Sequence, residues 1–437
     1  MNDVALMFWL PAAFVTYVYI GYPLILQAWA RVRARQCGLR IADQHAPSQP
    51  VKEQSADRSN QLANPQSATG APTARTVRRG VEVRNPQWGV SIVMAARNEG
   101  LRLAARLDNL LSLDFPAGKR QIIVVSDGST DDTLDVLAQY AGAVETVALP
   151  TGGKALALNA GAARARFDII VFADARQAFA PDALKALVSP FSDPSVGVVS
   201  GELLLDAESE LFAHRRTRTD RRTMARPTPS KAIERRRVER RQTSASTITD
   251  GVGVYWRYEK YLRRLESAVW STVGATGAIY AIRRELWRPL PPQTILDDVL
   301  TPMRVVLAGY RVVFNEHARA FDRVTADAEA EARRKVRTLG GNYQLPVLEP
   351  RLLLPWRNPI WLQYLSHKLG RLAVPYALLM LFAASIVMAE VSPFYQLALV
   401  VQVVFYLLAG YGAVIELHAR RQGGGAGTAV AAVRDVA

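Results

Sequence analysis

Long apolar stretches at both ends constrain this chain more than any other feature. Residues 5–30 contain no charged side chain, and a helix of that length can cross the roughly 30 Å hydrocarbon core of a bilayer. Asp3 precedes the stretch and three arginines follow it within residues 31–35, whereas a cleaved signal peptide starts with basic residues. We therefore expect residues 1–35 to form a transmembrane anchor.

The C-terminal region contains two further apolar stretches, residues 372–389 and 394–416, separated by a short turn with Pro393. Basic residues lie on the outer side of both stretches, which is the pattern of a transmembrane hairpin over residues 372–421. Because basic loops stay on the cytoplasmic side, we expect residues 31–371 to be cytoplasmic. The chain is then a multi-pass protein of the cell inner membrane.

Three other segments flank the central part of the chain. Residues 36–87 are rich in Gln, Ser, Ala, Pro and Thr and predict a flexible linker, and residues 422–437 predict a flexible tail. Residues 346–371 predict an interfacial helix region, because Trp, Tyr and basic side chains are mixed within residues 355–368. A buried soluble helix is the alternative interpretation of that last segment.

Between these segments, strand and helix patterns alternate. The predicted strands cover residues 90–96, 122–127, 144–150, 168–174 and 196–205, and the predicted helices lie near 100–113, from Asp131, at 154–166 and near 181–191. Such alternation produces right-handed βαβ units. We therefore predict an α/β domain over residues 88–345 with a Rossmann-like, mostly parallel sheet.

A strongly basic insertion over residues 206–250 interrupts the alternation. From His214 to Arg241 the chain has twelve Lys or Arg against three Asp or Glu, within a chain of net charge +15. A solvated loop and a contact of residues 214–241 with anionic membrane lipids both explain this composition. No aromatic residues are interleaved with the arginines, so we expect no nucleic acid as a partner.

Polar residues follow four of the predicted strands, at the edge where α/β sheets bind ligands. Asn98 and Glu99 follow the first strand, Asp127 ends the second, and Asp174 ends the fourth. A carboxylate at the end of a buried strand is costly unless it is paired or binds a metal. After the third strand, a glycine pair followed by Lys154 is compatible with a phosphate site and equally with a plain turn.

Four motifs in this order resemble the family 2 glycosyltransferases of the GT-A fold, a group that includes synthases of cellulose, hyaluronan, chitin and poly-N-acetylglucosamine. The motifs are AARNE, DGSTDDT, GGKALALNAG and FADA. The resemblance implies a nucleotide-sugar donor, bound by Ala96, Asn98, Glu99, Asp127, Lys154, Asp174 and Arg337. It also implies Mg²⁺ or Mn²⁺ at Asp174, the first acid of the family's DxD motif. Arg176 occupies the second acid's position, so either the cation has one carboxylate fewer or Arg176 itself supplies positive charge.

Later motifs extend the resemblance. The Gly-rich segment with Gly277 resembles the one lining the acceptor side, and Asp297-Asp298 resembles the acidic pair whose second member is the catalytic base. Capping of the following helix is the alternative role for the pair. Arg334 and Arg337 fall where processive synthases have Q-x-x-R-W, but only Arg337 matches, because Arg334 replaces the Gln and Thr338 the Trp. On the acceptor side the resemblance therefore implies Gly277, Asp297 and Arg334.

We therefore expect an inverting glycosyltransferase that moves a sugar, by family analogy from a UDP-sugar, to a lipid-linked or growing polysaccharide acceptor. Such an activity belongs to exopolysaccharide or cell-surface glycan synthesis. A processive polysaccharide synthase is one alternative, although three apolar spans are few for a translocating channel. A non-catalytic nucleotide-sugar-binding partner of a synthase is the other, because the metal motif is altered.

Overall fold

The computed structural model describes residues 2–36, 88–205, 255–322 and 328–434. Almost all of the expected linker and the whole basic insertion lie outside these residues, so the structure does not test those two predictions.

A mixed sheet forms the centre of the described domain. Its eight strands have the order β3-β2-β1-β4-β7-β6-β8-β5. The first four are parallel, and β7 lies antiparallel between β4 and β6. The strands are β1 (Val90–Ala96), β2 (Arg120–Asp127), β3 (Glu145–Leu149), β4 (Ile169–Asp174), β5 (Ala178–Phe179), β6 (Val196–Leu205), β7 (Ile279–Arg283) and β8 (Arg311–Asp322).

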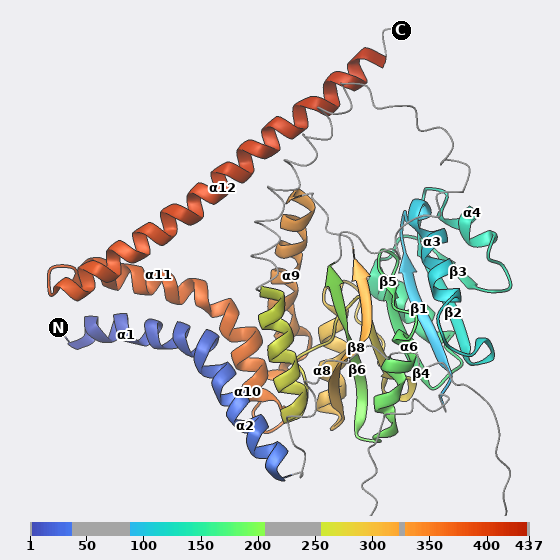
Figure 1. Ribbon diagram of the computed structural model, residues 1–437, viewed down its shortest axis with the longest axis horizontal. Coiled ribbons are helices and arrows are strands. Elements are labelled where there is room, and N and C mark those ends of the chain that lie inside the picture. The colour runs from blue at the N-terminus through green and yellow to red at the C-terminus, as the bar shows by residue number, and fades with distance from the viewer. Residues whose placement is uncertain (1, 37–87, 206–254, 323–327, 435–437) are drawn as a thin grey trace, which may run out of the picture.

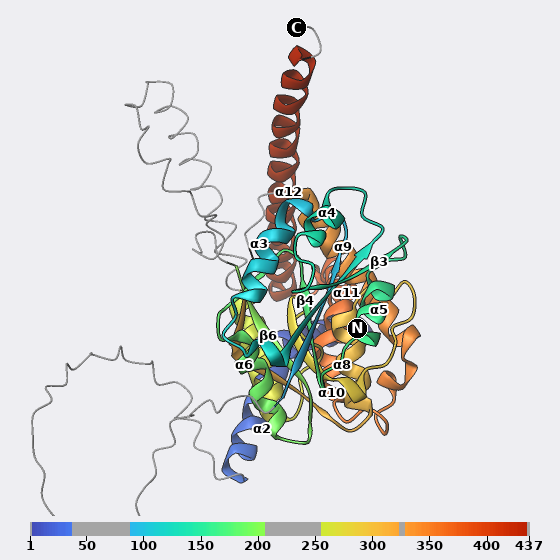
Figure 2. The same cartoon turned by 90° about the vertical axis from the view of Figure 1, so that its right-hand side faces the viewer.

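Helices cover both faces of the sheet (Figure 2). One face packs against α3 (Gly100–Leu111), α4 (Thr133–Ala138) and α6 (Ala183–Val188), and the other against α5 (Lys154–Ala163) and α8 (Asp297–Leu307). In α3 the buried residues Leu103, Leu107 and Leu110 recur at helical spacing, which turns one apolar stripe toward the sheet. Two separate apolar cores result, one on each face.

The predicted mostly parallel α/β sheet is confirmed, and all five predicted strands are present. Three strands were not predicted. Two of them, β7 and β8, follow the long insertion and are joined to the sheet by pairing with β4 and β6, far away in the sequence. The third, β5, has only two residues and pairs with β8.

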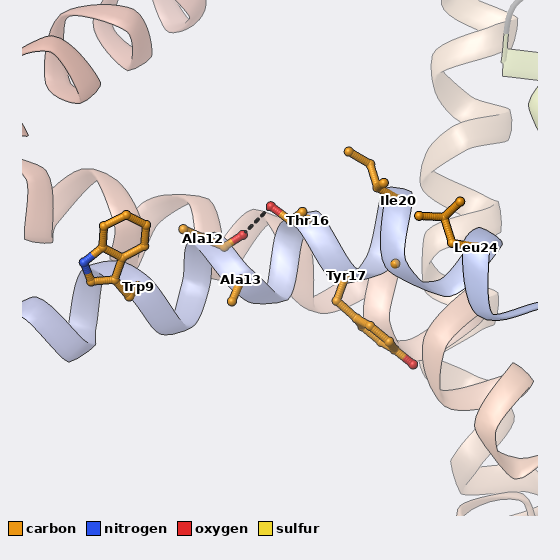
Figure 3. Close-up of a pocket in the computed structure, with 8 residues that line it drawn as sticks. Trp9, Ala12, Ala13, Thr16, Tyr17, Ile20 and Leu24 are labelled. Carbon is orange, nitrogen blue, oxygen red and sulfur yellow. Dashed lines mark hydrogen bonds between the residues drawn. The ribbon is translucent and has the colours of Figure 1, made fainter. Parts of the chain in front are cut away.

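Three helices in the described part of the chain are long and apolar enough to cross a membrane: Ala5–Arg35, Trp361–Met388 and Pro393–Gly412. The first comprises α1 (Asn2–Thr16), η1 (Tyr17–Gly21) and α2 (Tyr22–Gln36), and the second α10 (Trp361–Gln363), η9 (Tyr364–Leu369) and α11 (Gly370–Met388). The third lies within α12 (Pro393–Arg434). Figure 1 shows α1 beside α11. An apolar groove along the first helix includes Trp9, Tyr17 and Leu24 (Figure 3).

Helices in the C-terminal region cross two of the segment boundaries expected from the sequence. Within the expected interfacial region, a helix begins at Trp361 and continues without a break into α11. The residues before Trp361 that contain Pro355 and Pro359 are turns, as expected where proline removes backbone donors. The helix α12 extends into the segment expected to be a flexible tail, as far as Arg434.

Buried polar groups join the apolar helices to the sheet domain through the helix over residues 255–269. The Tyr22 hydroxyl donates to Glu266 at 2.7 Å, and His367 lies 2.7 Å from Glu266 and 3.1 Å from Glu259. Glu266 is fully buried, and a buried carboxylate is stable only with such partners. These contacts therefore fix the helices of Tyr22 and His367 against the 255–269 helix.

We predict that Tyr22→Phe lowers the free energy of unfolding by about 2 kcal/mol, because a buried carboxylate loses a donor. The matched control is Tyr17→Phe, in the same helical stretch. Tyr17 shares a 2.7 Å hydrogen bond with the Ser366 hydroxyl, so its loss leaves no charge unpaired and costs about 1 kcal/mol or less. Thermal unfolding of the full chain in one detergent measures both, and equal losses would contradict the prediction.

Candidate functional site

The polar ends of β1 and β2 are cross-linked by side chains. Asn98, which has a left-handed backbone (φ 55°), accepts a hydrogen bond from the Thr130 amide at 2.8 Å. The Gly100 amide donates to Asp131 at 3.0 Å, and the Glu99 amide to the Thr133 hydroxyl at 3.0 Å. These bonds hold the loops after two neighbouring parallel strands in one arrangement. They leave the Glu99 carboxylate half-buried at the rim, where burial raises its pKa and Arg102 partly offsets the effect.

Asp127 is buried and binds the turn before α5. Its carboxylate accepts hydrogen bonds from the amides of Gly152 at 2.7 Å and Gly153 at 3.0 Å. Gly153 has φ 93°, which glycine adopts without strain. Because the two amides already have a carboxylate partner, the plain turn is the better description of the Gly pair. Asp127 thereby positions Lys154, which directly follows Gly153.

Lys154 joins two carboxylates from different parts of the chain. Its ammonium lies 3.3 Å from Asp174, at the end of β4, and 3.3 Å from Asp297, at the start of α8. Burial lowers the pKa of Lys154, but Asp297 and Asp174 more than offset this and hold it above the ordinary value. Neither Asp297 nor Asp298 acts as the side-chain cap of α8, whose N-cap position is Leu296. The pairing with Lys154, not capping, accounts for the buried Asp297.

Asp298 lies beside the Gly-rich segment. A Cβ atom on Gly277 would come within 2.7 Å of Asp298 Oδ2, so only glycine leaves the carboxylate in this position. Burial raises the pKa of Asp298 to about 6 and Asp297 adds to this, while Lys154, Lys368 and Arg263 lower it. A carboxylate with this pKa can accept a proton near neutral pH.

One residue of the site was not predicted from the sequence. Arg106 is buried in α3, donates to the backbone carbonyl of Asp174 at 3.1 Å, and lies 4.2 Å over the Phe179 ring. Burial lowers its pKa to about 9. The feature of the sequence that could have identified Arg106 is its place as a basic residue on the apolar stripe of α3, next to Leu107. Through this hydrogen bond, Arg106 holds the backbone of Asp174 in place at the end of β4.

The remaining predicted site residues lie around this centre. Ala96 is buried at the end of β1, and Arg176 is exposed two residues after Asp174. Arg334 and Arg337 are exposed on α9 (Ala328–Leu348), where Arg337 donates to the Ile295 carbonyl at 3.5 Å. Gln344 of the same helix accepts from the Ile295 amide at 3.1 Å. These two contacts place α9 over the loop that leads to Asp297 and Asp298.

Among the described residues of the site, Asp174 is the carboxylate that we expect to bind a divalent cation. Among the described residues, no group of three or more His, Cys, Asp or Glu could hold a metal. Asp174 has one oxygen beside Lys154 and a side chain that is 33% exposed, so it can offer one carboxylate. Mg²⁺ and Mn²⁺ accept such sites when substrate phosphates and water complete the coordination.

Comparison with known proteins agrees with the strand-end geometry. Residues 91–263 match the family model described as Glycosyl transferase family 2. The fold is that of the mannosyltransferase PcManGT from Pyrobaculum calidifontis, solved with GDP-Man and Mn²⁺, at a TM-score of 0.57 and 19% identity over 92% of each chain. This is a GT-A-type α/β domain. The match over residues 91–263 confirms the resemblance to this family that was seen in the sequence.

Two curated relatives show how wide the family is. A beta-monoglucosyldiacylglycerol synthase of Nostoc sp. is 33% identical over 138 residues, which is 30% of this chain and 30% of the relative. A poly-beta-1,6-N-acetyl-D-glucosamine synthase of Staphylococcus aureus is 22% identical over 265 residues, 59% of this chain and 55% of the relative. The chain thus spans about half or less of the length of these relatives.

We predict opposite effects for alanine at two adjacent glycines of α9. A Cβ atom on Gly341 would lie 2.5 Å from Leu296 Cγ and 2.9 Å from Ile295 Cγ2, whereas one on Gly340 meets no atom within 4 Å. Gly341→Ala should cost about 1–3 kcal/mol through overpacking. Gly340→Ala should leave stability unchanged or raise it by up to about 1 kcal/mol. Thermal unfolding of both variants checks this, and a destabilised Gly340→Ala would count against the arrangement of α9.

Proposed function

We propose that the chain is a membrane-anchored inverting glycosyltransferase that moves a sugar from a nucleotide-sugar to a hydroxyl of a lipid-linked or growing polysaccharide acceptor. The observation that carries the proposal is the meeting of Asp174, Lys154 and Asp297 beside Asp298. This arrangement puts a cation and a proton-accepting carboxylate at the sheet edge where α/β folds bind ligands.

The donor would lie across the ends of β1, β2 and β4. Asn98, Glu99 and Asp127 border the place where the nucleoside is expected, and Lys154, which lies 3.3 Å from Asp174, is the cation that we assign to the diphosphate. A UDP-sugar is our first choice, by resemblance, although the solved structural neighbour holds GDP-Man. Mg²⁺ or Mn²⁺ at Asp174 would neutralise the diphosphate charge. Exposed Arg337 on α9 is the second cation that we assign to the donor.

Asp298 is the proposed general base. Its carboxylate takes the proton of the acceptor hydroxyl, the hydroxyl oxygen bonds to the anomeric carbon, and the bond from that carbon to the diphosphate oxygen breaks. The nucleoside diphosphate leaves with the bonding electron pair. Attack from the side opposite the leaving group inverts the anomeric configuration. Lys154 would favour departure, because its positive charge at this sheet edge would stabilise the negative charge of the leaving diphosphate.

The membrane arrangement is part of the proposal. We assign residues 88–345 to a catalytic domain in the cytoplasm, anchored in the cell inner membrane by the three apolar helices, because basic residues flank those helices on one side. The relatives are named as synthases of a glucosyldiacylglycerol and of a poly-N-acetylglucosamine. We favour a non-processive enzyme, because Thr338 stands where processive synthases have Trp and its hydroxyl bonds within α9 to the Arg334 carbonyl.

Donor turnover tests the proposal directly. Full chain purified in detergent is offered UDP-, GDP- and TDP-sugars with Mg²⁺, Mn²⁺ or EDTA, and release of nucleoside diphosphate is measured. We expect turnover of one donor, its loss in EDTA, and a fall of about 100- to 10,000-fold in Asp298→Asn. Asp135→Asn, on α4, is the control and should act as wild type, since Asp135 is exposed in the first turn of that helix. Absence of binding to every donor would sink the proposal.

The pH dependence gives a second test. The pKa of Asp298 is raised from 3.8 to about 6, and only the unprotonated carboxylate can act as a base. Transfer should therefore be maximal above about pH 7 and fall about tenfold for each pH unit below the pKa. Initial rates between pH 4.5 and 8 at saturating donor measure this. A profile that stays flat down to pH 4.5 would exclude Asp298 as the titrating base.

A further inference from the structure

The loop that leads to Asp298 has no regular secondary structure of its own. Residues 290–296, which we call the base loop, contain no helix or strand, and Pro291 and Pro292 lack backbone donors. Gln293, in the middle, has φ 67°, a left-handed conformation that is strained for a residue other than glycine. Such a backbone persists only where its surroundings hold it. The position of Asp298 therefore depends on the contacts of the base loop with other elements.

The helix α5 holds the base loop at both ends. The side-chain amide of Asn159 donates to the Leu290 carbonyl at 2.8 Å and accepts from the Leu290 amide at 2.8 Å. Lys154, the first residue of the same helix, lies 3.3 Å from Asp297, which directly follows the base loop. One helix thus fixes both the start and the end of the base loop.

The helix α9 holds the middle of the base loop. The side-chain amide of Gln344 donates to the Gln293 carbonyl at 3.1 Å, and its oxygen accepts from the Ile295 amide at 3.1 Å. Three residues earlier on α9, Gly341 packs so closely that an added Cβ atom would lie 2.5 Å from Leu296 Cγ. One side chain therefore holds the strained residue and the residue two positions after it.

The end of α9 is also tied to α8, the helix that begins with the two acids. Glu349, which directly follows α9, is buried and lies 3.3 Å from Arg304 of α8. Arg304 donates in addition to the Pro289 carbonyl at 3.2 Å, just before the base loop. Asp298 thus lies between a loop and a helix that α9 contacts at the same time.

We propose that Gln344 and Asn159 are positioning residues for Asp298, and that their side-chain amides hold the base loop so that the carboxylate can reach the acceptor hydroxyl. The inference rests on the proposed function, because Asp298 is the base of that reaction. An amide side chain donates and accepts at once, so it can hold a backbone segment through both kinds of group. A displacement of about 1 Å at a reacting group can lower a rate about 100-fold.

Hydrogen exchange tests whether the amides hold the base loop, whatever the activity of the chain. Full chain in detergent is transferred to D₂O, and exchange is followed in peptides that cover residues 290–298. We expect exchange at least about fivefold faster in Gln344→Ala and in Asn159→Ala than in the wild type. The matched control is Asn342→Ala, which removes from α9 an amide that donates to the Thr338 carbonyl at 2.9 Å within the helix, and which should exchange as wild type.

Kinetics test the positioning role. Release of nucleoside diphosphate is measured with the UDP-, GDP- or TDP-sugar that the wild type turns over. Gln344→Ala and Asn159→Ala should lower kcat about 10- to 100-fold and change the donor KM by less than about threefold, because the amides act on the base and not on the donor. Gln344→Met keeps much of the side-chain volume and loses both hydrogen bonds, so it should behave as Gln344→Ala.

Unchanged exchange of the base loop in both amide variants would overturn its hold by Gln344 and Asn159. Full kcat in Gln344→Met, a raised donor KM at full kcat, or an equal loss of kcat in Asn342→Ala would overturn the positioning role. A wild type that turns over no donor would sink the proposed function, and the exchange experiment would then decide the hold on the base loop by itself.

Discussion

Neutralisation of carboxylates at one end of the sheet is the constraint on which the site depends. Asp174 ends β4, and Asp297 and Asp298 begin α8, so without a cation these elements would repel each other. Lys154 lies 3.3 Å from both Asp174 and Asp297 and is the first residue of α5, which ties three elements to one point. Asp298 has no ion pair within the described residues. Burial raises its pKa to about 6, which makes it the carboxylate suited to accept a proton.

The sheet and part of the site could be predicted from local patterns. Buried runs such as residues 90–96 are strands because they are apolar over their whole length, and parallel strands bring their carboxyl ends to one edge. Asp127 and Asp174 were therefore predictable as members of a candidate site at that edge. Their actual partners were not, because the amides of Gly152 and Gly153 bind Asp127 only once the turn has formed.

Contacts between distant residues account for what the sequence could not predict. The strand β7 joins the sheet by pairing with β4, more than 100 residues earlier, and no local pattern specifies an antiparallel partner. Arg106 is recognisable only once its helix is packed, because an arginine in an amphipathic helix is normally solvated. Likewise, the sequence shows His367 only as one residue of a segment that mixes aromatic and basic side chains. Its contacts with Glu259 and Glu266 are visible only in the structure.

The 255–269 helix makes the membrane helices and the site one unit. Glu259, Arg263 and Glu266 have the spacing i, i+4, i+7 and lie on one helical face. From that face the two acids bind His367 and Arg371 of the apolar helix, and Arg263 binds Thr276 beside Gly277. A shift of the apolar helix would have to break buried ion pairs or carry Thr276 with it. The depth of the chain in the membrane would thus set the position of the acceptor side relative to Asp298.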